Sequence, residues 1–382
     1  MPWRESRVEE QRLAFVAAAM RSGANRRALC REFGISAPTG YKWLARVAAD
    51  GLVAGIRDQS RRPHRSPTQI DPALEAQIVQ LRQQYGWGGR KLRTLLSPAA
   101  CATATIDRVI RRQGLTDRDA AHRPAPHRFV APTPNALWQM DFKGQYPVHD
   151  GWTFPLSILD DYSRFAIGLT ALRGTAAEPV QAVLTQCFQR YGVPDAMLLD
   201  HGVPWWSPTN GHGLTQLTVF LLEQDIRLTY CGFAHPQTQG KVERFHRTLG
   251  RRLRQWGVPT THRGVAHALT RFRTEYNTVR PHEALGDRPP ATCYQPSARV
   301  FQVQPPPWPY PASQVVHRVN VNGALRFERR LFYISDALAH REVGCQQIGD
   351  RVLVLFRHLP VRELDLTTGR TSRALRDVRP EV

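Results

Sequence analysis

The sequence has no long hydrophobic run. No stretch approaches the roughly 18–20 consecutive apolar residues that a membrane-spanning helix needs. The first seven residues do not open an apolar segment of the kind that directs secretion. We therefore expect a cytoplasmic protein with no membrane partner. With 382 residues, 42% of them hydrophobic, the chain can form about two to four globular domains.

Cysteine is scarce and scattered. No two of the six cysteines form a Cys-x-x-Cys pair, and none has the spacing to histidine that zinc sites show. This pattern excludes the common structural zinc sites, and we expect buried thiols in a reducing compartment. The cysteines are Cys30, Cys101, Cys187, Cys231, Cys293 and Cys345.

Acidic residues are few relative to basic ones. The chain has 52 lysines and arginines against 32 aspartates and glutamates, a net charge of +20. A GC-rich genome can favour arginine over lysine, but it does not by itself produce an excess of base over acid. Residues 1–130 hold 23 basic and 11 acidic residues, so +12 of the charge falls in the first third. This balance predicts a nucleic-acid partner.

Residues 26–44 have the layout of a helix-turn-helix. Gly34 can end one helix in the left-handed conformation, Ser36 can cap the next, and Pro38 is tolerated in its first turn. A plain helical hairpin is the alternative. The residues expected to pack, counting a first helix over 7–22, are Val8, Leu13, Phe15, Val16, Tyr41, Leu44 and Val47. The candidate DNA contacts are Thr39, Lys42 and Arg46.

A second helical unit is predicted over residues 71–114. Helical spacing puts three apolar residues of its last helix on one face and arginines on the other. Solvated helix faces alone would more often mix the two signs of charge, so we favour a second DNA-binding unit. The inward residues are Ile106, Val109 and Ile110, and the candidate DNA contacts are Arg90, Lys91, Arg108 and Arg111.

After a proline-rich segment the pattern changes to strands and helices in the order β-β-β-α-β-α-β-α. This order predicts an α/β core, a mixed five-stranded sheet flanked by helices. Short strands after a second proline-rich segment predict a small C-terminal β-barrel. The expected parts are a helix-turn-helix domain (1–55), a basic linker (56–70), a second helical domain (71–114), a linker (115–135), the core (136–298), a linker (299–313) and a β domain (314–382).

Three acids of the core stand in settings that suit a metal ligand. Asp141 lies in an apolar strand, where a charge is costly unless it is paired or bound to metal. Asp200 ends a buried strand, where ligands collect in open α/β sheets. Glu243 begins a helix whose apolar stripe faces the sheet. Asp160 and Asp161 are rival carboxylates, but a tight turn explains them structurally.

Any one of the three acids is readily explained as a cap or a surface charge, and the prediction rests on all three together. Carboxylate oxygens suit Mg²⁺, or Mn²⁺ in its place. Two such ions can clamp the attacking and leaving oxygens of an in-line phosphoryl displacement. On a chain this basic, we expect the substrate to be a phosphodiester.

Five ordered segments of the core are specific enough to suggest a family: Trp138–Phe142, Leu159–Arg164, Leu199–Gly202, His235–Leu249 and Tyr276–Leu285. Together they resemble the DDE transposases of the retroviral-integrase type, and most of all the IS481 family of bacterial insertion sequences. The resemblance implies an RNase H-like core in which Asp141, Asp200 and Glu243 bind two Mg²⁺ or Mn²⁺ ions and form the catalytic triad.

The sequence departs from that family at two points. His201 stands where family members often carry asparagine, and 42 residues separate Asp200 from Glu243, more than the family's usual spacing. Residues 204–213 are the expected insertion, which costs little in loop-closure entropy. Its Trp205 and Trp206 are expected either to stack on an unpaired base at a DNA end or to form a hydrophobic cover.

The resemblance also implies a function. A transposase binds the terminal repeats of its element, frees a 3′-OH with water, and joins that 3′-OH to target DNA, as a homodimer or larger assembly on the nucleoid. Lys241 and Arg244 are expected to contact DNA phosphates beside Glu243. Two alternatives stay open: a DNA-binding regulator with an inactive core, and an RNase H-like nuclease outside transposition.

Overall fold

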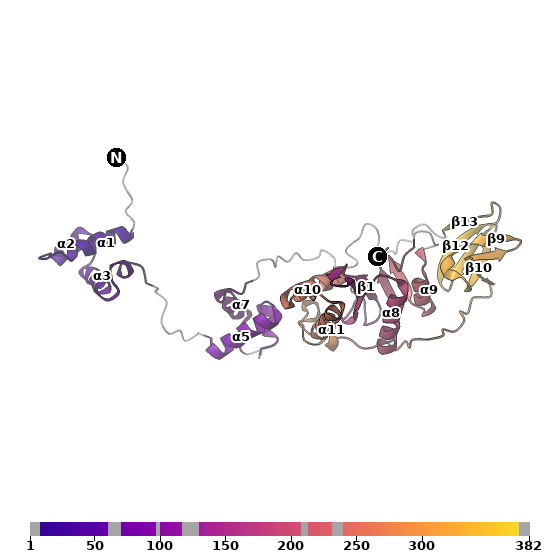
Figure 1. Ribbon diagram of the computed structural model, residues 1–382, viewed down its shortest axis with the longest axis horizontal. Coiled ribbons are helices and arrows are strands. Elements are labelled where there is room, and N and C mark those ends of the chain that lie inside the picture. Colours follow the sequence, from indigo (N-terminus) through magenta and orange to yellow (C-terminus); the bar gives the residue numbers. More distant parts are fainter. Residues whose placement is uncertain are drawn as a thin grey trace. The chain divides into compact units, whose positions relative to one another are not determined.

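Figure 1 shows the computed structural model, which describes residues 8–59, 70–96, 100–116, 130–207, 213–230 and 240–373. The chain forms two compact units, Met1–Asp71 and Pro72–Val382. Most of the predicted basic linker, and residues 117–129 of the first proline-rich linker, lie outside the described residues. Within the described ranges no helix is both long enough and apolar enough to cross a membrane.

The first unit contains the predicted helix-turn-helix. Gly34, with φ at +64°, follows the first helix of the motif. Ser36 caps the second helix, because its side chain accepts a hydrogen bond from the Thr39 amide at 3.4 Å. The predicted turn and cap are therefore confirmed. The helices of this unit are α1 (Val8–Ala19), α2 (Arg26–Glu32), α3 (Ala37–Asp50) and α4 (Leu52–Gly55).

Three residues that were expected to pack in the first unit are exposed. Val8, Leu13 and Tyr41 are 60%, 40% and 45% exposed, so their predicted core positions are wrong. On α3 the buried side chains are Trp43 and Val47, which lie one turn apart on one face, and Tyr41 lies off that line. The core of the unit consists of Phe15, Val16, Ala19, Cys30, Trp43 and Val47.

The second unit begins with a small helical bundle. The inward residues predicted for its last helix, Ile106, Val109 and Ile110, are all buried. A side-chain bond also closes the bundle, since the Gly89 amide donates to Asp107 Oδ1 at 3.0 Å. The helices are α5 (Pro72–Tyr85), α6 (Gly89–Arg93) and α7 (Thr103–Arg112).

A mixed sheet forms the centre of the second unit. Its strand order is β4-β3-β1-β5-β6, with β1, β5 and β6 parallel to one another and β3 antiparallel to both β1 and β4. The predicted order of strands and helices along the chain is confirmed apart from the short β2, which pairs with the first residues of β3 and was not predicted. The strands are β1 (Trp138–Phe142), β2 (Tyr146–Val148), β3 (Gly151–Asp160), β4 (Ala166–Leu172), β5 (Ala196–Leu199) and β6 (Arg227–Tyr230).

Helices cover both faces of this sheet. Met140 and Ile158 belong to a core shared with α8 and α9, whereas Leu159 and Leu169 belong to a core shared with α10 and α11. The central strands β3, β4 and β5 are thus buried on both sides, which explains their nearly continuous apolar sequence. The helices are α8 (Ala177–Tyr191), α9 (Gln216–Glu223), α10 (Gly240–Trp256) and α11 (His262–Thr278).

The start of α8 differs from the prediction. Thr175 and Glu178 have the residue types and spacing of a capping box, but Ala176 occupies the cap position and no side chain caps this helix end. The helix begins one residue too late for Thr175 to reach its first turn. A capping box does occur at α9, where Thr215 and Thr218 bond to each other's backbone amides.

The C-terminal strands surround a core of their own. They form a five-stranded antiparallel sheet, in the order β13-β12-β11-β10-β7, and a separate hairpin of β8 and β9. Leu214, just before α9, and Leu222, within α9, also belong to this core. Closure into a barrel stays a prediction. The strands are β7 (Val315–Arg318), β8 (Ala324–Phe327), β9 (Arg330–Tyr333), β10 (Glu342–Ile348), β11 (Arg351–Phe356), β12 (Leu359–Asp365) and β13 (Arg370–Arg373).

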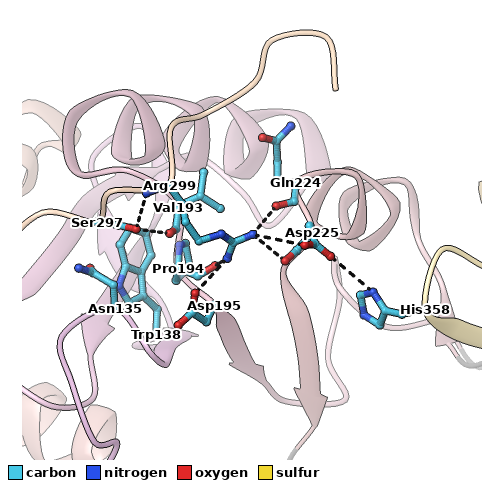
Figure 2. A network of polar contacts seen from close by, with 10 residues as sticks. All are labelled: Asn135, Trp138, Val193, Pro194, Asp195, Gln224, Asp225, Ser297, Arg299 and His358. Carbon is cyan, nitrogen blue, oxygen red and sulfur yellow. Dashed lines mark hydrogen bonds and ion pairs between the residues drawn. The ribbon is translucent and has the colours of Figure 1, made fainter. Parts of the chain in front are cut away.

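The start of the second proline-rich linker is bonded to the sheet. Figure 2 shows the Arg299 guanidinium pointing at the loops before β5 and β6. It donates to the carbonyl oxygens of Gln224 and Asp225 at 3.0 and 2.8 Å and pairs with Asp195 at 3.3 Å. Together with the Pro194 carbonyl, which also accepts from Arg299, four acceptors hold the planar guanidinium in one orientation. The chain therefore leaves the core along a defined path.

The expectation of buried thiols is only partly right. Cys30, Cys187 and Cys345 are buried, but Cys101 and Cys293 are partly exposed. All five are free cysteines, and Cys231 lies outside the described residues.

Candidate active site

Asp141 lies near the carboxyl end of β1. Its strand neighbours Trp138 and Met140 are fully buried, and its own side chain is 20% exposed. On the other side it pairs with Ser157 of β3. The aspartate is thus held rigidly at the edge of an apolar strand, as the sequence predicts.

Asp200 follows the last residue of β5. The parallel register pairs Gln139 of β1 with Leu198 of β5, and two residues further along each strand stand Asp141 and Asp200. Asp200 Oδ1 accepts hydrogen bonds from the Gly202 amide at 2.9 Å and from the Trp205 indole. The register and these bonds place both aspartates at the same edge of the sheet.

Glu243 lies in the first turn of α10. The helix packs against the sheet through Val242 and Phe245, which are buried, whereas Glu243 is exposed. The loop that precedes α10, residues 231–239, contains the sequence motif residues His235 and Gln237 and lies outside the described residues. The glutamate therefore stands at the entrance of the helix, as predicted, with its carboxylate open to solvent.

Electrostatics couples the three acids. The pKa of Asp141 is raised from its ordinary value of 3.8 to about 7, first by burial, then by the negative charge of Asp200 and also by that of Glu243. Among the described residues, however, no three His, Cys, Asp or Glu side chains are gathered closely enough to hold one metal ion. The three carboxylates repel one another at one edge of the sheet without surrounding a single point.

His246 is a neighbour of this site that the sequence reasoning did not single out. Its Nδ1 lies 3.8 Å from Asp141 Oδ2, and its Nε2 lies 2.9 Å from Ser157 Oγ. Burial, and then the charge of Lys143, lower its pKa to about 3, so the ring is neutral at pH 7. A sequence signal was present, because residues 243 and 246 are three apart and share one helix side.

Trp205 fits one of its two expected roles, a hydrophobic cover, and has a further contact that was not expected. It is 1% exposed and its ring stacks on Phe142, with centroids 5.5 Å apart, so it is not available to stack on a base. It does cover the site hydrophobically, and its indole N–H also donates to Asp200. Trp206 is partly exposed beside Tyr230, and residues 208–212 of the insertion lie outside the described residues.

Replacing Trp205 by phenylalanine separates these two contributions. The ring can still stack on Phe142, but Asp200 loses a hydrogen-bond donor. We expect roughly a tenfold slower rate of any reaction at this site, because hydrogen bonds to charged groups contribute about 1.5–3 kcal/mol. A matched Trp206→Phe variant should keep the wild-type rate in the same cleavage assay. Equal rates for wild type and Trp205→Phe would remove Trp205 from the site.

The rival acids have structural roles. Asp160 accepts bonds from the Asn135 amide at 2.7 Å and the Ser163 amide at 2.8 Å. Asp161 accepts from the Ala131 amide at 2.7 Å and forms an ion pair with Lys241. These bonds also attach residues 131–135, part of the predicted linker, to the core. Lys241 was expected to face DNA, but in this structure its ammonium points inward to Asp161.

The other candidate DNA contacts fall into two groups. On α3, Lys42 is exposed, while Arg46 lies over the Trp43 ring at 4.9 Å and Thr39 bonds to Ser36. On the helical bundle of the second unit, Arg90 is engaged in ion pairs with Glu283 and Asp287, at 2.8 and 3.0 Å. The candidates that are exposed to solvent are Lys42, Arg90, Arg108, Arg111 and Arg244, and of these Arg90 is the one held in ion pairs with Glu283 and Asp287.

Known protein families match four parts of this chain, which form two overlapping pairs. A helix-turn-helix domain family matches residues 11–64, and a homeodomain-like domain family matches residues 39–110. Two families described as integrase core domains match residues 131–236 and 224–290. The core is similar to integrase cores. Together with the strand order of the sheet, these matches show an RNase H-like core preceded by helix-turn-helix domains.

Individual relatives agree with the family matches. The Gag-Pol polyprotein of baboon endogenous virus (strain M7) is 26% identical over 235 residues, which are 57% of this chain but 13% of the polyprotein. An uncharacterized 39.2 kDa protein of insertion element IS476 from Xanthomonas euvesicatoria is 26% identical over 254 residues, which are 63% of this chain and 69% of that protein. A structure of the HTLV-2 integrase catalytic core domain in complex with magnesium aligns with 43% of this chain and 99% of its own, at 14% identity and a TM-score of 0.35.

Proposed function

We propose that this protein is the transposase of an insertion element, of the IS481 type, and that it transfers DNA strands. The observation that carries the proposal is Asp141, a rigid, half-buried carboxylate whose pKa is raised by burial and by the charges of Asp200 and Glu243. It lies at the edge of an integrase-like core on a chain with a net charge of +20. The helix-turn-helix domains supply the means to bind the ends of the element.

The chemical types of the residues at this edge of the sheet suit a divalent cation. Three hard oxygen donors repel one another, and among the described residues no lysine or arginine pairs with any of them, so a cation would relieve the repulsion. Asp141, Asp200 and Glu243 would hold one or two Mg²⁺ or Mn²⁺ ions. Such ions, when bound, stabilise the charge that develops on phosphodiester oxygens.

The protein's own side chains would orient the reacting groups. Gly202 and Trp205 fix the Asp200 carboxylate by hydrogen bonds. His246, neutral and bonded to Ser157, supports Asp141 without contributing a charge. Arg244 and Arg247, exposed on α10 beside Glu243, would neutralise DNA phosphates near the reacting one. Water, and then a freed 3′-OH, would be the nucleophile, with no covalent enzyme intermediate.

One observation favours the alternative, a DNA-binding regulator with an inactive core. Glu243 is exposed, and no three acids in the described ranges are gathered around one point. A regulator would bind DNA without changing it. A transposase would bring the glutamate inward when DNA and metal arrive, so the two functions differ in what the protein does to its DNA.

The proposal is tested with the purified full chain and duplex oligonucleotides that carry the sequences flanking its gene. With Mg²⁺ or Mn²⁺ present, we expect nicking at the element end and joining of the new 3′-OH to other DNA. Labelled strands separated on denaturing gels report both steps. Specific binding without any strand cleavage would support the regulator, and a preference for RNA–DNA hybrids would indicate a nuclease.

A further inference from the structure

A cavity of about 800 Å³ lies between the α5–α7 bundle and the α10–α11 side of the core. On the bundle it is lined by the turn and first residues of α6, including Arg90 and Lys91. On the core it is lined by Arg251 and Arg252 of α10 and by Arg280 and the segment that follows it. Basic side chains therefore enter the cavity from both sides.

Two of these cations have no partner of opposite charge. Among the described residues, neither the Lys91 ammonium nor the Arg280 guanidinium makes a hydrogen bond or an ion pair, and Arg280 lies only over the Trp87 ring, at 5.7 Å. Both side chains are half-buried. The carboxylates in the cavity wall, Glu283 and Asp287, are held by Arg90. Burying an unpaired charge is costly, so an occupant of opposite charge is expected.

His282 does not line the cavity, but it lies two residues after Arg280 and near enough to Lys91 for the charges of both to act on it. His282 has a buried Nε2 atom without a hydrogen-bond partner. Burial, together with the charges of Arg280 and Lys91, lowers the pKa of His282 to about 3, so the ring is neutral and can donate one hydrogen bond. The pKa of Lys91 is lowered to about 7, first by burial and then by Arg280 and Arg244. Burial is the first cause of both shifts, and the crowding of like charges adds to each.

Two acids oppose this crowding. The charges of Asp287 and Glu283 both attract Lys91, and Asp287 has a buried oxygen, Oδ1, without a partner. Both carboxylates are bonded to Arg90. Because Lys91, Arg244 and Arg280 stand beside them as well, the local charge stays positive.

We propose that Lys91, Arg244, Arg280 and His282 bind one phosphate group of a DNA backbone. We call these four residues the phosphate cluster. Ammonium and guanidinium groups are the donors that proteins use for phosphate, and a neutral imidazole N–H adds a third kind of donor. The Tyr276–Leu285 segment, which stood out in the sequence but has no place in the carboxylate site, thereby gains a role.

DNA is a better occupant than a small phosphorylated molecule. Arg244 directly follows Glu243 on α10, so the phosphate cluster adjoins the carboxylate site. Lys91 belongs to α6, within the range that matches a homeodomain-like DNA-binding family. A backbone phosphate held by both parts would fix the distance between the recognised sequence and the strand that is cut. This inference rests on the proposed function and deepens it.

The test measures how DNA binding depends on salt. Fluorescence anisotropy with a short labelled duplex of arbitrary sequence, over a series of potassium chloride concentrations, gives the slope of log affinity against log salt. We expect Lys91→Gln to reduce that slope by about 0.9, the value for one lost phosphate contact. We also expect roughly tenfold weaker binding at physiological salt, and Lys91→Arg should restore both quantities.

A second readout separates a binding role from a structural one. Removing an unpaired, half-buried charge should stabilise the DNA-free protein, so we expect Lys91→Gln to raise its thermal midpoint by about 2–4 °C. A residue needed only for packing would lower it. Arg190→Gln is the matched control, because Arg190 is an exposed arginine in the last turn of α8, far along the chain from the cluster. It should keep the wild-type slope.

The outcomes distinguish this inference from the proposed function. Failure of the wild-type protein to bind the duplex would overturn both. Wild-type binding with an unchanged slope in Lys91→Gln would overturn the phosphate cluster alone. Inorganic phosphate is the probe for the remaining outcome. It would have to raise the thermal midpoint of wild type but not of Lys91→Gln, while the salt slopes of DNA binding agree between the two proteins. In that case the cluster binds free phosphate and the DNA assignment is wrong.

Discussion

Replacing Asp141 by asparagine is expected to slow strand cleavage and joining by roughly a thousandfold or more while leaving DNA affinity unchanged. Asparagine has the size of aspartate but lacks the charge that a divalent cation needs. Loss of metal-based charge stabilisation removes several kcal/mol from the transition state, and each 1.36 kcal/mol is about a factor of ten in rate. DNA binding is retained because the helix-turn-helix domains are untouched. Gel assays measure the reaction, and anisotropy measures binding.

The same substitution should stabilise the metal-free protein. In the folded chain the pKa of Asp141 is raised from 3.8 to about 7. The folded state therefore binds the proton more tightly than the unfolded state, and stability is lost as the pH rises from about 4 through about 7. The difference corresponds to up to about 4 kcal/mol. Asparagine avoids this loss, so its gain in thermal midpoint should be largest at pH 8 and shrink towards pH 4.

Asp150→Asn is the matched control for both effects. Asp150 is an exposed acid that pairs with Arg173 on the surface, where ion pairs contribute little. This variant should keep the wild-type rate and nearly the wild-type midpoint at every pH. An Asp141→Asn protein that cleaves DNA at the wild-type rate would show that the reaction takes place elsewhere.

Arg252→Met is expected to lower the free energy of unfolding by about 3–5 kcal/mol. Arg252 is 5% exposed and pairs with Glu275, which is 15% exposed. Its Nη1 also donates to the Gln84 carbonyl at 2.6 Å and to Gln255 Oε1 at 2.7 Å. Methionine fills similar space but leaves the largely buried Glu275 carboxylate without its cation, which is the costly way to break a buried pair. Urea unfolding monitored by circular dichroism measures the loss.

Two further variants make this prediction specific. Arg351→Met breaks a pair in which the arginine is 63% exposed, so it should change stability by less than about 1 kcal/mol. Arg252→Met combined with Glu275→Leu removes both charges and should regain part of the loss. Since Gln84 belongs to α5 and Arg252 to α10, the single variant should also loosen the bundle from the core. Equal stability of Arg252→Met and wild type would contradict this account.

Local patterns were sufficient to predict the order of the elements. Alternating apolar residues and a cap such as Ser36 act within one turn or strand, so the sequence shows them directly. Core positions on single helices were less predictable, because burial depends on which other elements pack against the helix. Val8 and Leu13 are apolar but exposed, since among the described residues no neighbouring element covers that side of α1. The capping box suggested by Thr175 and Glu178 does not form for a smaller reason, because α8 begins one residue later than that pattern requires.

The three acids of the candidate site were predictable because each stands in a characteristic stretch of local sequence. Asp141 and Asp200 end parallel neighbouring strands, and sheet geometry alone brings them together. The partners of the site come from distant segments, so their contacts could not be read from spacing. The pair of Lys241 with Asp161 spans 80 residues, and the stacking of Trp205 on Phe142 depends on how an insertion folds back. The phosphate cluster could not be predicted for the same reason, because its residues come from α6, from α10 and from the segment after α11.

The central claim is that Asp141, Asp200 and Glu243 share one cation site, and counting bound Mn²⁺ tests it most directly. Electron paramagnetic resonance of free Mn²⁺, titrated into the full chain with a DNA duplex present, gives the number and affinity of bound ions. The account predicts one or two ions bound by wild type, and their loss or marked weakening in each of Asp141→Asn, Asp200→Asn and Glu243→Gln. Binding that is absent in wild type, or equal in all four proteins, would contradict it.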